Sequence, residues 1–294
     1  MDEETRTQLV VGFTAEGDEA DLDGIERLHR LENLELQAPV RNIQRISELG
    51  TLRRLDMWDC RDLVGWDFLD GLDELTDLRL NLVRTGALAQ VARLGSLKSL
   101  SLERWSSLTD LRPLTALPYL EDLSITGVDL TDLSPLGEFP NLTALRLERL
   151  PDLDDLSPLA AIPRLTELTL CDLDGIQDLT ALAALPALET LTIDALHGLD
   201  GQLDDLGPSG FMGVGFDELT LFPLTHLREL TSLVLADLDS TIDFRPLNKL
   251  PKLRRVTVRG VLVTSVEAVR NVQRDGGWQW TSTEDEHEET WSRP

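Results

Sequence analysis

The sequence has 294 residues, of which 41% are hydrophobic but only 5% are aromatic, so leucine must supply most of any core. Acidic residues outnumber basic residues 53 to 27, and the formal charge of −26 disfavours binding to nucleic acid and to anionic membrane surfaces. We therefore expect no nucleic-acid and no membrane partner, and the length suits either two ordinary domains or a repeat array.

The N-terminal segment lacks the basic start and apolar run of a secretory signal, and no stretch approaches the ~20 apolar residues of a spanning helix. Cys60 and Cys171 lie far apart, which suits a reducing compartment. These features predict a soluble, cytoplasmic protein. The apolar run from Leu9 to Phe13 predicts an edge strand, and residues 1–30 are assigned to an N-terminal cap.

Residues 31–260 repeat one pattern of six positions. It consists of an apolar residue, two variable residues, a second apolar residue, one variable residue and a third apolar residue. The pattern begins at Leu31, Leu52, Leu75, Leu97, Leu120, Leu142, Leu165, Leu188, Phe211, Leu230 and Leu253. Chance does not maintain a period of 19 to 23 residues over eleven units. The end of each unit alternates with period two, which predicts a short strand. The array is therefore expected to form a parallel, concave sheet of about eleven strands with one open polar face.

Between these strands the apolar residues recur every three positions, as at Leu150, Leu153 and Leu156. Three residues per turn is the spacing of a 3-10 helix rather than an α-helix. In phase with this spacing, the sequence Asp-Leu-Ser-Pro-Leu occurs at Asp132 and at Asp155, where the aspartate can cap a turn and the proline can begin it. The fold class predicted is an α/β solenoid with a convex side of 3-10 turns and loops.

After the array, residues 261–280 are predicted to form a C-terminal cap. Thr264 to Glu267 has a capping-box pattern that begins a helix, and Trp278 to Trp280 alternates like a final strand. Residues 281–294 form an acidic, polar tail that is expected to be loose.

The units resemble leucine-rich repeats over about residues 22 to 260. Their 22- to 23-residue length and aspartate–proline signature are similar to the short bacterial subclass found in internalins and to a phosphatase regulatory subunit. The ninth position, where the family usually places a laddering asparagine, holds Cys60 and otherwise valine, tryptophan or leucine. We expect an apolar column there, which is similar to the C-terminal arrays of bacterial NACHT-type NTPases, although this chain has no G-x-x-x-x-G-K-[ST] phosphate loop.

The open face is the candidate binding surface, because tryptophan and arginine are enriched at binding hot spots and gather near its N-terminal half. The proposed protein-binding residues are Arg53, Asp56, Trp58, Arg79, Ser101, Arg104 and Arg146. The alternative interpretation is that the arginines only pair with Asp56, Glu103 and Glu148 on neighbouring strands.

Nothing in the sequence singles out catalytic, cofactor-binding or metal-binding residues. His197 and Cys171 are too far apart in the repeat to favour a nucleophilic pair. The function that the resemblance implies is non-catalytic protein–protein recognition, as the ligand-sensing or scaffolding part of a cytoplasmic bacterial signalling or defence system. One alternative is a regulatory subunit that docks on an enzyme such as a phosphatase, and another is an enzyme in its own right.

Overall fold

The structure is a computed structural model. It describes residues 8–11, 20–37, 39–61, 63, 65–84, 86–105, 107–176, 179–195, 218–237, 241–259, 279–283 and 288–292. The chain divides into two compact units: unit 1 is Met1–Leu130 with Glu138–Leu142, and unit 2 is Thr131–Gly137 with Thr143–Pro294.

Unit 1 is built on six parallel strands, each paired with the strand of the next repeat. They are β1 (Gln8–Val11), β3 (Asn33–Leu36), β5 (Arg54–Met57), β6 (Asp77–Asn81), β7 (Ser99–Glu103) and β8 (Asp122–Thr126). A short pair, β2 (Ala20–Asp21) and β4 (Val40–Arg41), lies outside this sheet. The predicted N-terminal edge strand is therefore present as β1.

Unit 2 continues the parallel pattern with five strands and then ends with an antiparallel hairpin. The parallel strands are β9 (Ala144–Glu148), β10 (Glu167–Cys171), β11 (Thr190–Asp194), β13 (Ser232–Ala236) and β15 (Arg255–Arg259). Strand β17 (Glu288–Ser292) pairs antiparallel with β15, and β16 (Gln279–Thr283) pairs antiparallel with β17. A separate short pair consists of β12 (Glu218–Thr220) and β14 (Thr241–Asp243).

One predicted repeat strand is not part of this sheet. Strand β11 pairs directly with β13, with Thr192 opposite Val234, so a strand at Phe211–Phe216 cannot lie between them. The hydroxyl of Thr231 likewise bonds the carbonyl of Glu189, 42 residues earlier, where other repeats span about 22 or 23. The predicted Phe211 strand falls in 196–217, outside the described residues. The longer spacing between the two flanking repeats marks residues 196–217 as an insertion in the sequence repeat.

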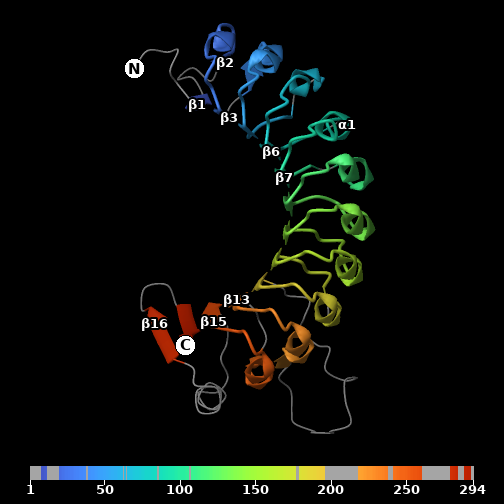
Figure 1. Cartoon of the computed structure of the whole chain (residues 1–294), viewed down its shortest axis with the longest axis vertical. Coiled ribbons are helices and arrows are strands. Elements are labelled where there is room, and N and C mark those ends of the chain that lie inside the picture. Colours follow the sequence, from blue (N-terminus) through green and yellow to red (C-terminus); the bar gives the residue numbers. More distant parts are fainter. Residues whose placement is uncertain are drawn as a thin grey trace. The chain divides into compact units, whose positions relative to one another are not determined.

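The return segments are 3-10 helices, as the period-three spacing predicted. They are η2 (Ile25–Arg27), η3 (Ile43–Glu48), η4 (Asp67–Leu69), η5 (Arg112–Ala116), η6 (Ser134–Glu138), η7 (Ser157–Ala161), η8 (Thr180–Ala184), η10 (Phe222–His226) and η11 (Arg245–Lys249). Among the described residues the one α-helix is α1 (Leu88–Val91), which has four residues. Within each unit the helices lie along one side of the strands (Figure 1).

The geometry that recurs in these turns begins with an aspartate. The carboxylates of Asp110, Asp132, Asp155 and Asp243 each accept the backbone N–H of the residue two positions later, at 2.7 to 2.9 Å. The proline then follows at the start of the 3-10 helix, where no N–H donor is needed. The aspartates therefore cap the turns as the sequence predicted.

The core lies between the strands and the 3-10 helices and is mostly leucine. In the strands, side chains alternate between buried and accessible, as in β9, where Leu145 and Leu147 are buried and Arg146 is exposed. The ninth repeat positions are buried too and contribute Cys60, Val83, Trp105, Val128, Leu150 and Leu173. An apolar column thus replaces the asparagine ladder, as expected.

At the C-terminal end, only some of the predicted elements are present among the described residues. The capping-box helix at Thr264–Glu267 lies outside the described residues, and Trp278 does too. The predicted final strand is present as β16. The expectation of a loose acidic tail is wrong for residues 281–283, which belong to β16, and for residues 288–292, whose backbone pairs with both β15 and β16. Backbone hydrogen bonds fix this segment without requiring an apolar sequence pattern.

Candidate protein-binding surface

The open face of unit 1 carries one straight row of side chains. The parallel register places Glu35 beside Asp56, Asp56 beside Arg79, and Arg79 beside Ser101. These residues occupy the same position in successive repeats, and neighbouring strands of a sheet lie about 4.8 Å apart. The sequence repeat alone therefore brings Asp56, Arg79 and Ser101 together, as predicted.

Trp58 follows β5 and is held in place by groups from two neighbouring strands. Its indole Nε1–H donates a 3.1 Å hydrogen bond to Oε1 of Glu35 on β3. The guanidinium carbon of Arg79 on β6 lies 5.8 Å from the centroid of the Trp58 ring, within cation–π range. The tryptophan nevertheless remains 38% exposed. It is an oriented aromatic surface that is open to a partner.

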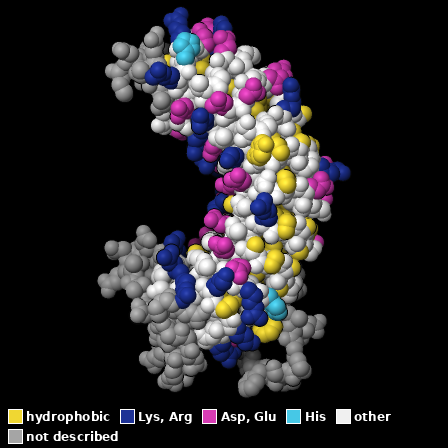
Figure 2. All heavy atoms as spheres, viewed as in Figure 1, with side chains coloured by type: hydrophobic (Ala, Val, Ile, Leu, Met, Phe, Trp, Pro, Cys, Tyr) yellow, Lys and Arg dark blue, Asp and Glu magenta, His cyan; other side chains and the backbone are white. Residues whose placement is uncertain are grey.

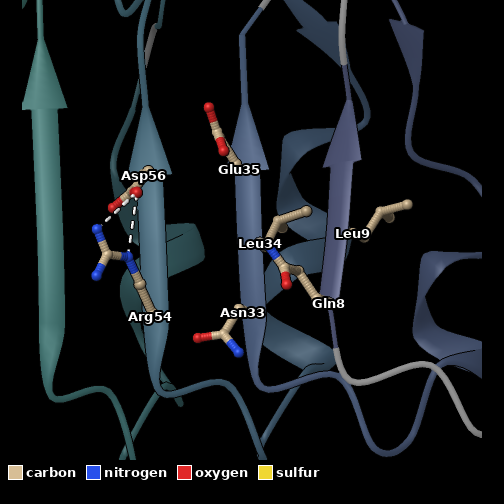
Figure 3. A pocket seen from close by; sticks show the side chains of 7 residues that line it. All are labelled: Gln8, Leu9, Asn33, Leu34, Glu35, Arg54 and Asp56. Atoms are coloured by element: carbon tan, nitrogen blue, oxygen red, sulfur yellow. Dashed lines mark hydrogen bonds and ion pairs between the residues drawn. The ribbon is translucent and has the colours of Figure 1, made fainter.

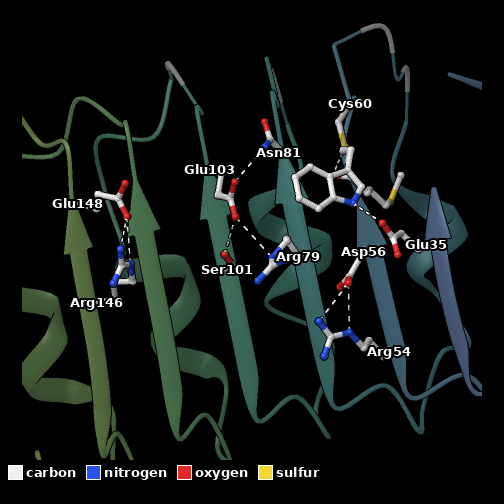
Figure 4. A network of polar contacts seen from close by, with 12 residues as sticks. Glu35, Arg54, Asp56, Cys60, Arg79, Asn81, Ser101, Glu103, Arg146 and Glu148 are labelled. Atoms are coloured by element: carbon white, nitrogen blue, oxygen red, sulfur yellow. Dashed lines mark hydrogen bonds and ion pairs between the residues drawn. The ribbon is translucent and has the colours of Figure 1, made fainter. Parts of the chain in front are cut away.

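Arg79 is in turn positioned by an acidic side chain on β7. Its Nε lies 3.5 Å from Oε1 of Glu103, close enough for an ion pair, but this buried Nε lacks a well-aligned hydrogen bond. Glu103 also accepts hydrogen bonds from Ser101 at 3.3 Å and from Asn81 at 2.9 Å. Figure 4 shows this network, which extends from β3 to β7. Arg79 and Glu103 therefore form the kind of cross-strand ion pair that the alternative interpretation expected.

The open face is hollowed into a pocket of about 330 Å³ above β1, β3 and β5 (Figure 3). The lining residues are Gln8, Leu9, Asn33, Leu34, Glu35, Arg54 and Asp56. Arg54 holds Oδ2 of Asp56 through Nε and Nη2, both at 3.1 Å. Asp56 is 8% exposed, which is unusual for a carboxylate, and this guanidinium neutralises it locally.

Three of the predicted contact residues lie apart from this network. Arg53 precedes β5 and reaches Glu74 in the following turn, at 3.4 Å. Arg104 follows β7 with a left-handed φ of 51° and forms no ion pair among the described residues. Arg146 belongs to unit 2, where its guanidinium pairs with Glu148 on the same strand.

Several residues of this surface are not among the predicted contact residues. Gln8, Asn33 and Glu35 were not singled out, although Glu35 occupies the same repeat position as Asp56 and so carried a usable signal. Charge is interleaved rather than segregated on the face displayed in Figure 2, where Lys and Arg alternate with Asp and Glu over unit 1. Such alternation does not distinguish a contact site from a solvated face.

The two cysteines are poor nucleophiles. Burial raises the pKa of the Cys60 thiol to about 12, and burial together with nearby carboxylates raises that of Cys171 to about 11. His197, the imagined partner of Cys171, lies outside the described residues. Among the residues with described positions, no three His, Cys, Asp or Glu side chains converge as a metal site would require. In that same part of the chain, no helix has the length and apolar character needed to cross a bilayer.

Neither the protein-family models nor the curated protein sequences match this chain. Several solved structures are similar to it. An internalin (inlF) from Listeria monocytogenes is similar over 92% of this chain and 72% of its own, with a TM-score of 0.63 and 25% identity. A second Listeria internalin (inlC2) is 28% identical, with a TM-score of 0.51 over 64% of this chain and 80% of its own.

A leucine-rich repeat protein from Leptospira interrogans shares the fold over 92% of this chain and 77% of its own, with a TM-score of 0.55 and 15% identity. The chain is a leucine-rich repeat protein.

Proposed function

We propose that this chain is a non-catalytic recognition module that binds a protein partner on the open face of unit 1. The observation that supports it is the orientation of Trp58, whose indole N–H bonds Glu35 while the Arg79 guanidinium carbon lies 5.8 Å from its ring centroid. Aromatic and arginine side chains that are ordered before binding lose little conformational entropy when a partner arrives. A sheet of repeats supplies the rigid support that such a surface needs.

The wider setting that we propose is a cytoplasmic bacterial signalling or defence system, in which this chain senses a ligand or holds a scaffold. The bacterial origin of the similar solved structures supports the bacterial part of this proposal. The resemblance of the apolar column to arrays of NACHT-type NTPases supports the signalling part, and it stays a prediction. Fold alone does not dictate function, so the proposal is tested by substitutions on the open face.

The test is affinity capture from a bacterial lysate, with the wild-type chain compared with matched variants. The binding variant combines Trp58→Ala with Arg79→Ala. The control combines Tyr119→Ala with Arg112→Ala, which removes an exposed aromatic and an exposed arginine from the turn and helix side of the same unit. We expect a protein that the wild type and the control retain and the binding variant loses. A partner retained equally by all three would contradict the open-face site.

Arg146→Ala is used as bait in a separate capture experiment, because Arg146 lies in unit 2. Its guanidinium is already satisfied by Glu148, at 3.0 Å from Nε. We therefore expect this variant to retain the partner much as the wild type does.

A further inference from the structure

The pocket on the open face contains hydrogen-bond acceptors that the protein itself leaves unused. Trp58 and Gln37 both donate to Oε1 of Glu35, so Oε2 has no partner among the described residues. Arg54 likewise engages only Oδ2 of Asp56, which leaves Oδ1 without one in that part of the chain. Figure 3 shows both carboxylates on neighbouring strands beside the pocket.

Two amide side chains complete the lining. Gln8 and Asn33 form no side-chain hydrogen bond with any residue that the structure describes, and both line the pocket. Each offers a carbonyl oxygen as a further acceptor. The lining carries two carboxylates against the single guanidinium of Arg54, so it has an excess of negative charge within a chain of charge −26.

We propose that this pocket receives an arginine side chain of the protein partner, a specificity that rests on the function proposed above. A guanidinium presents five N–H donors in a planar fork, which suits several acceptors on two neighbouring strands. A lysine ammonium is a compact point charge and would satisfy fewer of them. The guanidinium of Arg54 already binds one carboxylate oxygen of Asp56, Oδ2, at this pocket.

The shape of the site agrees with this occupant. A volume of about 330 Å³ is at the small end for ligand pockets, which begin at roughly 300 Å³, and it accommodates one long side chain rather than a folded segment. Trp58 donates to Glu35, which lines the pocket, so its exposed ring can cover the apolar stem of the incoming arginine. The partner segment would therefore lie across β1, β3 and β5 and then meet Trp58 and Arg79.

The probe is a five-residue peptide, acetyl-Gly-Ser-Arg-Ser-Gly-amide, titrated into the full chain. The indole N–H of Trp58 is the reporter in a nitrogen–proton NMR spectrum, because it donates to the same carboxylate that the arginine would engage. The indole of Trp105 is buried and donates to Ser107, so it serves as an internal control. Trp58→Phe identifies the reporter resonance by its loss.

We expect the arginine peptide to shift the Trp58 resonance progressively and to leave that of Trp105 unmoved. Peptides with citrulline or lysine in place of arginine test charge and fork geometry separately, and both should bind at least about tenfold more weakly, as expected when charged hydrogen bonds are lost. Glu35→Gln and Asp56→Asn should each reduce arginine-peptide affinity by about tenfold for the same reason. Glu48→Gln removes a carboxylate from η3 instead and should change it less than about twofold.

Equal binding of the arginine and citrulline peptides would overturn the proposal. So would a loss in the Glu48→Gln variant as large as in Glu35→Gln, since the attraction would then be non-specific. The citrulline comparison uses the wild-type chain and does not depend on the folding of any variant. If lysate capture succeeds through Trp58 and Arg79 while the arginine peptide fails, the arginine pocket is wrong and the recognition function stands.

Discussion

The backbone N–H of Ala195 donates a 3.0 Å hydrogen bond to the carbonyl of Ala236, and Ala195 holds a left-handed φ of 50° to do so. The same conformation follows the strand in most described repeats. It occurs at Leu82, Arg104, Gly127, Arg149, Asp172, Ala195 and Asp237. At Ala195 the bond reaches β13 directly, so this turn preserves the repeat register across the insertion at 196–217.

This conformation predicts an unusual substitution pattern at Ala195. Ala195→Val should lower the free energy of unfolding by about 1–2 kcal/mol, because a β-branched residue is strained at positive φ. Ala195→Gly should cause no loss, because glycine adopts this conformation freely and already occupies the equivalent position at Gly127. Urea denaturation of both variants measures the difference. Equal stability of the two variants would show that the backbone strain is not felt.

Gly175 predicts a steric effect of a different kind. A Cβ added there would lie 2.3 Å from the carbonyl oxygen of Leu153 in the preceding repeat, far inside van der Waals contact. Backbone cannot yield as a flexible side chain can, so Gly175→Ala should destabilise unit 2 by more than about 1 kcal/mol. Gly95→Ala is the matched control, since a Cβ there meets nothing within 4 Å. Thermal unfolding of the two variants decides whether the repeats are packed this closely.

The leucine core predicts a steep contrast between neighbours on β9. Leu145 is buried, so Leu145→Ala should cost about 2–5 kcal/mol through lost burial and a cavity. Leu145→Asp should prevent folding of unit 2, because it buries an unpaired charge. Arg146→Ala removes an exposed side chain from the open face and should change stability by less than about 1 kcal/mol. Comparable losses at both positions would contradict the alternation of the strand.

The capping aspartates predict a dependence of stability on pH. The backbone N–H and the hydroxyl of Ser157 hydrogen-bond to Asp155 and lower the pKa of its carboxyl from the ordinary value of 3.8. A lowered pKa in the folded state contributes stability above pH 3.8 that is lost as pH falls through the folded value. Asp155→Ala should therefore lower the urea midpoint at neutral pH, and the gap to wild type should shrink below about pH 4. A gap that stays constant with pH would rule out this charged cap.

The sequence predicts most of the fold because its leucines carry two distinct periods. The period of two near Leu145 specifies a strand, and the period of three after Leu150 specifies a 3-10 helix. The apolar pattern at Phe211 predicted a strand that the direct pairing of β11 with β13 leaves no place for between them. Apolar spacing alone does not reveal which strands are neighbours. Strand β17 was missed because the acidic stretch around Glu288 carries no apolar alternation, and its antiparallel pairing with β15 leaves no period in the sequence.

The candidate surface was predictable only in part. Register follows from the repeat, so the alignment of Asp56, Arg79 and Ser101 could be derived from spacing. Which carboxylate bonds Trp58, and that Arg79 pairs with Glu103, depends on side-chain conformations that no sequence period encodes. Acidic residues are also too abundant in this chain for Glu35 to be distinguished by type.

The most direct test of the recognition surface is site-specific photo-crosslinking. A photoreactive amino acid replaces Ser101 on β7 in one variant and Thr115 on η5 in another, which places the probe on opposite sides of unit 1. We predict that the captured partner crosslinks from position 101 and not from position 115. Crosslinking from 115 with none from 101 would contradict recognition by the open face.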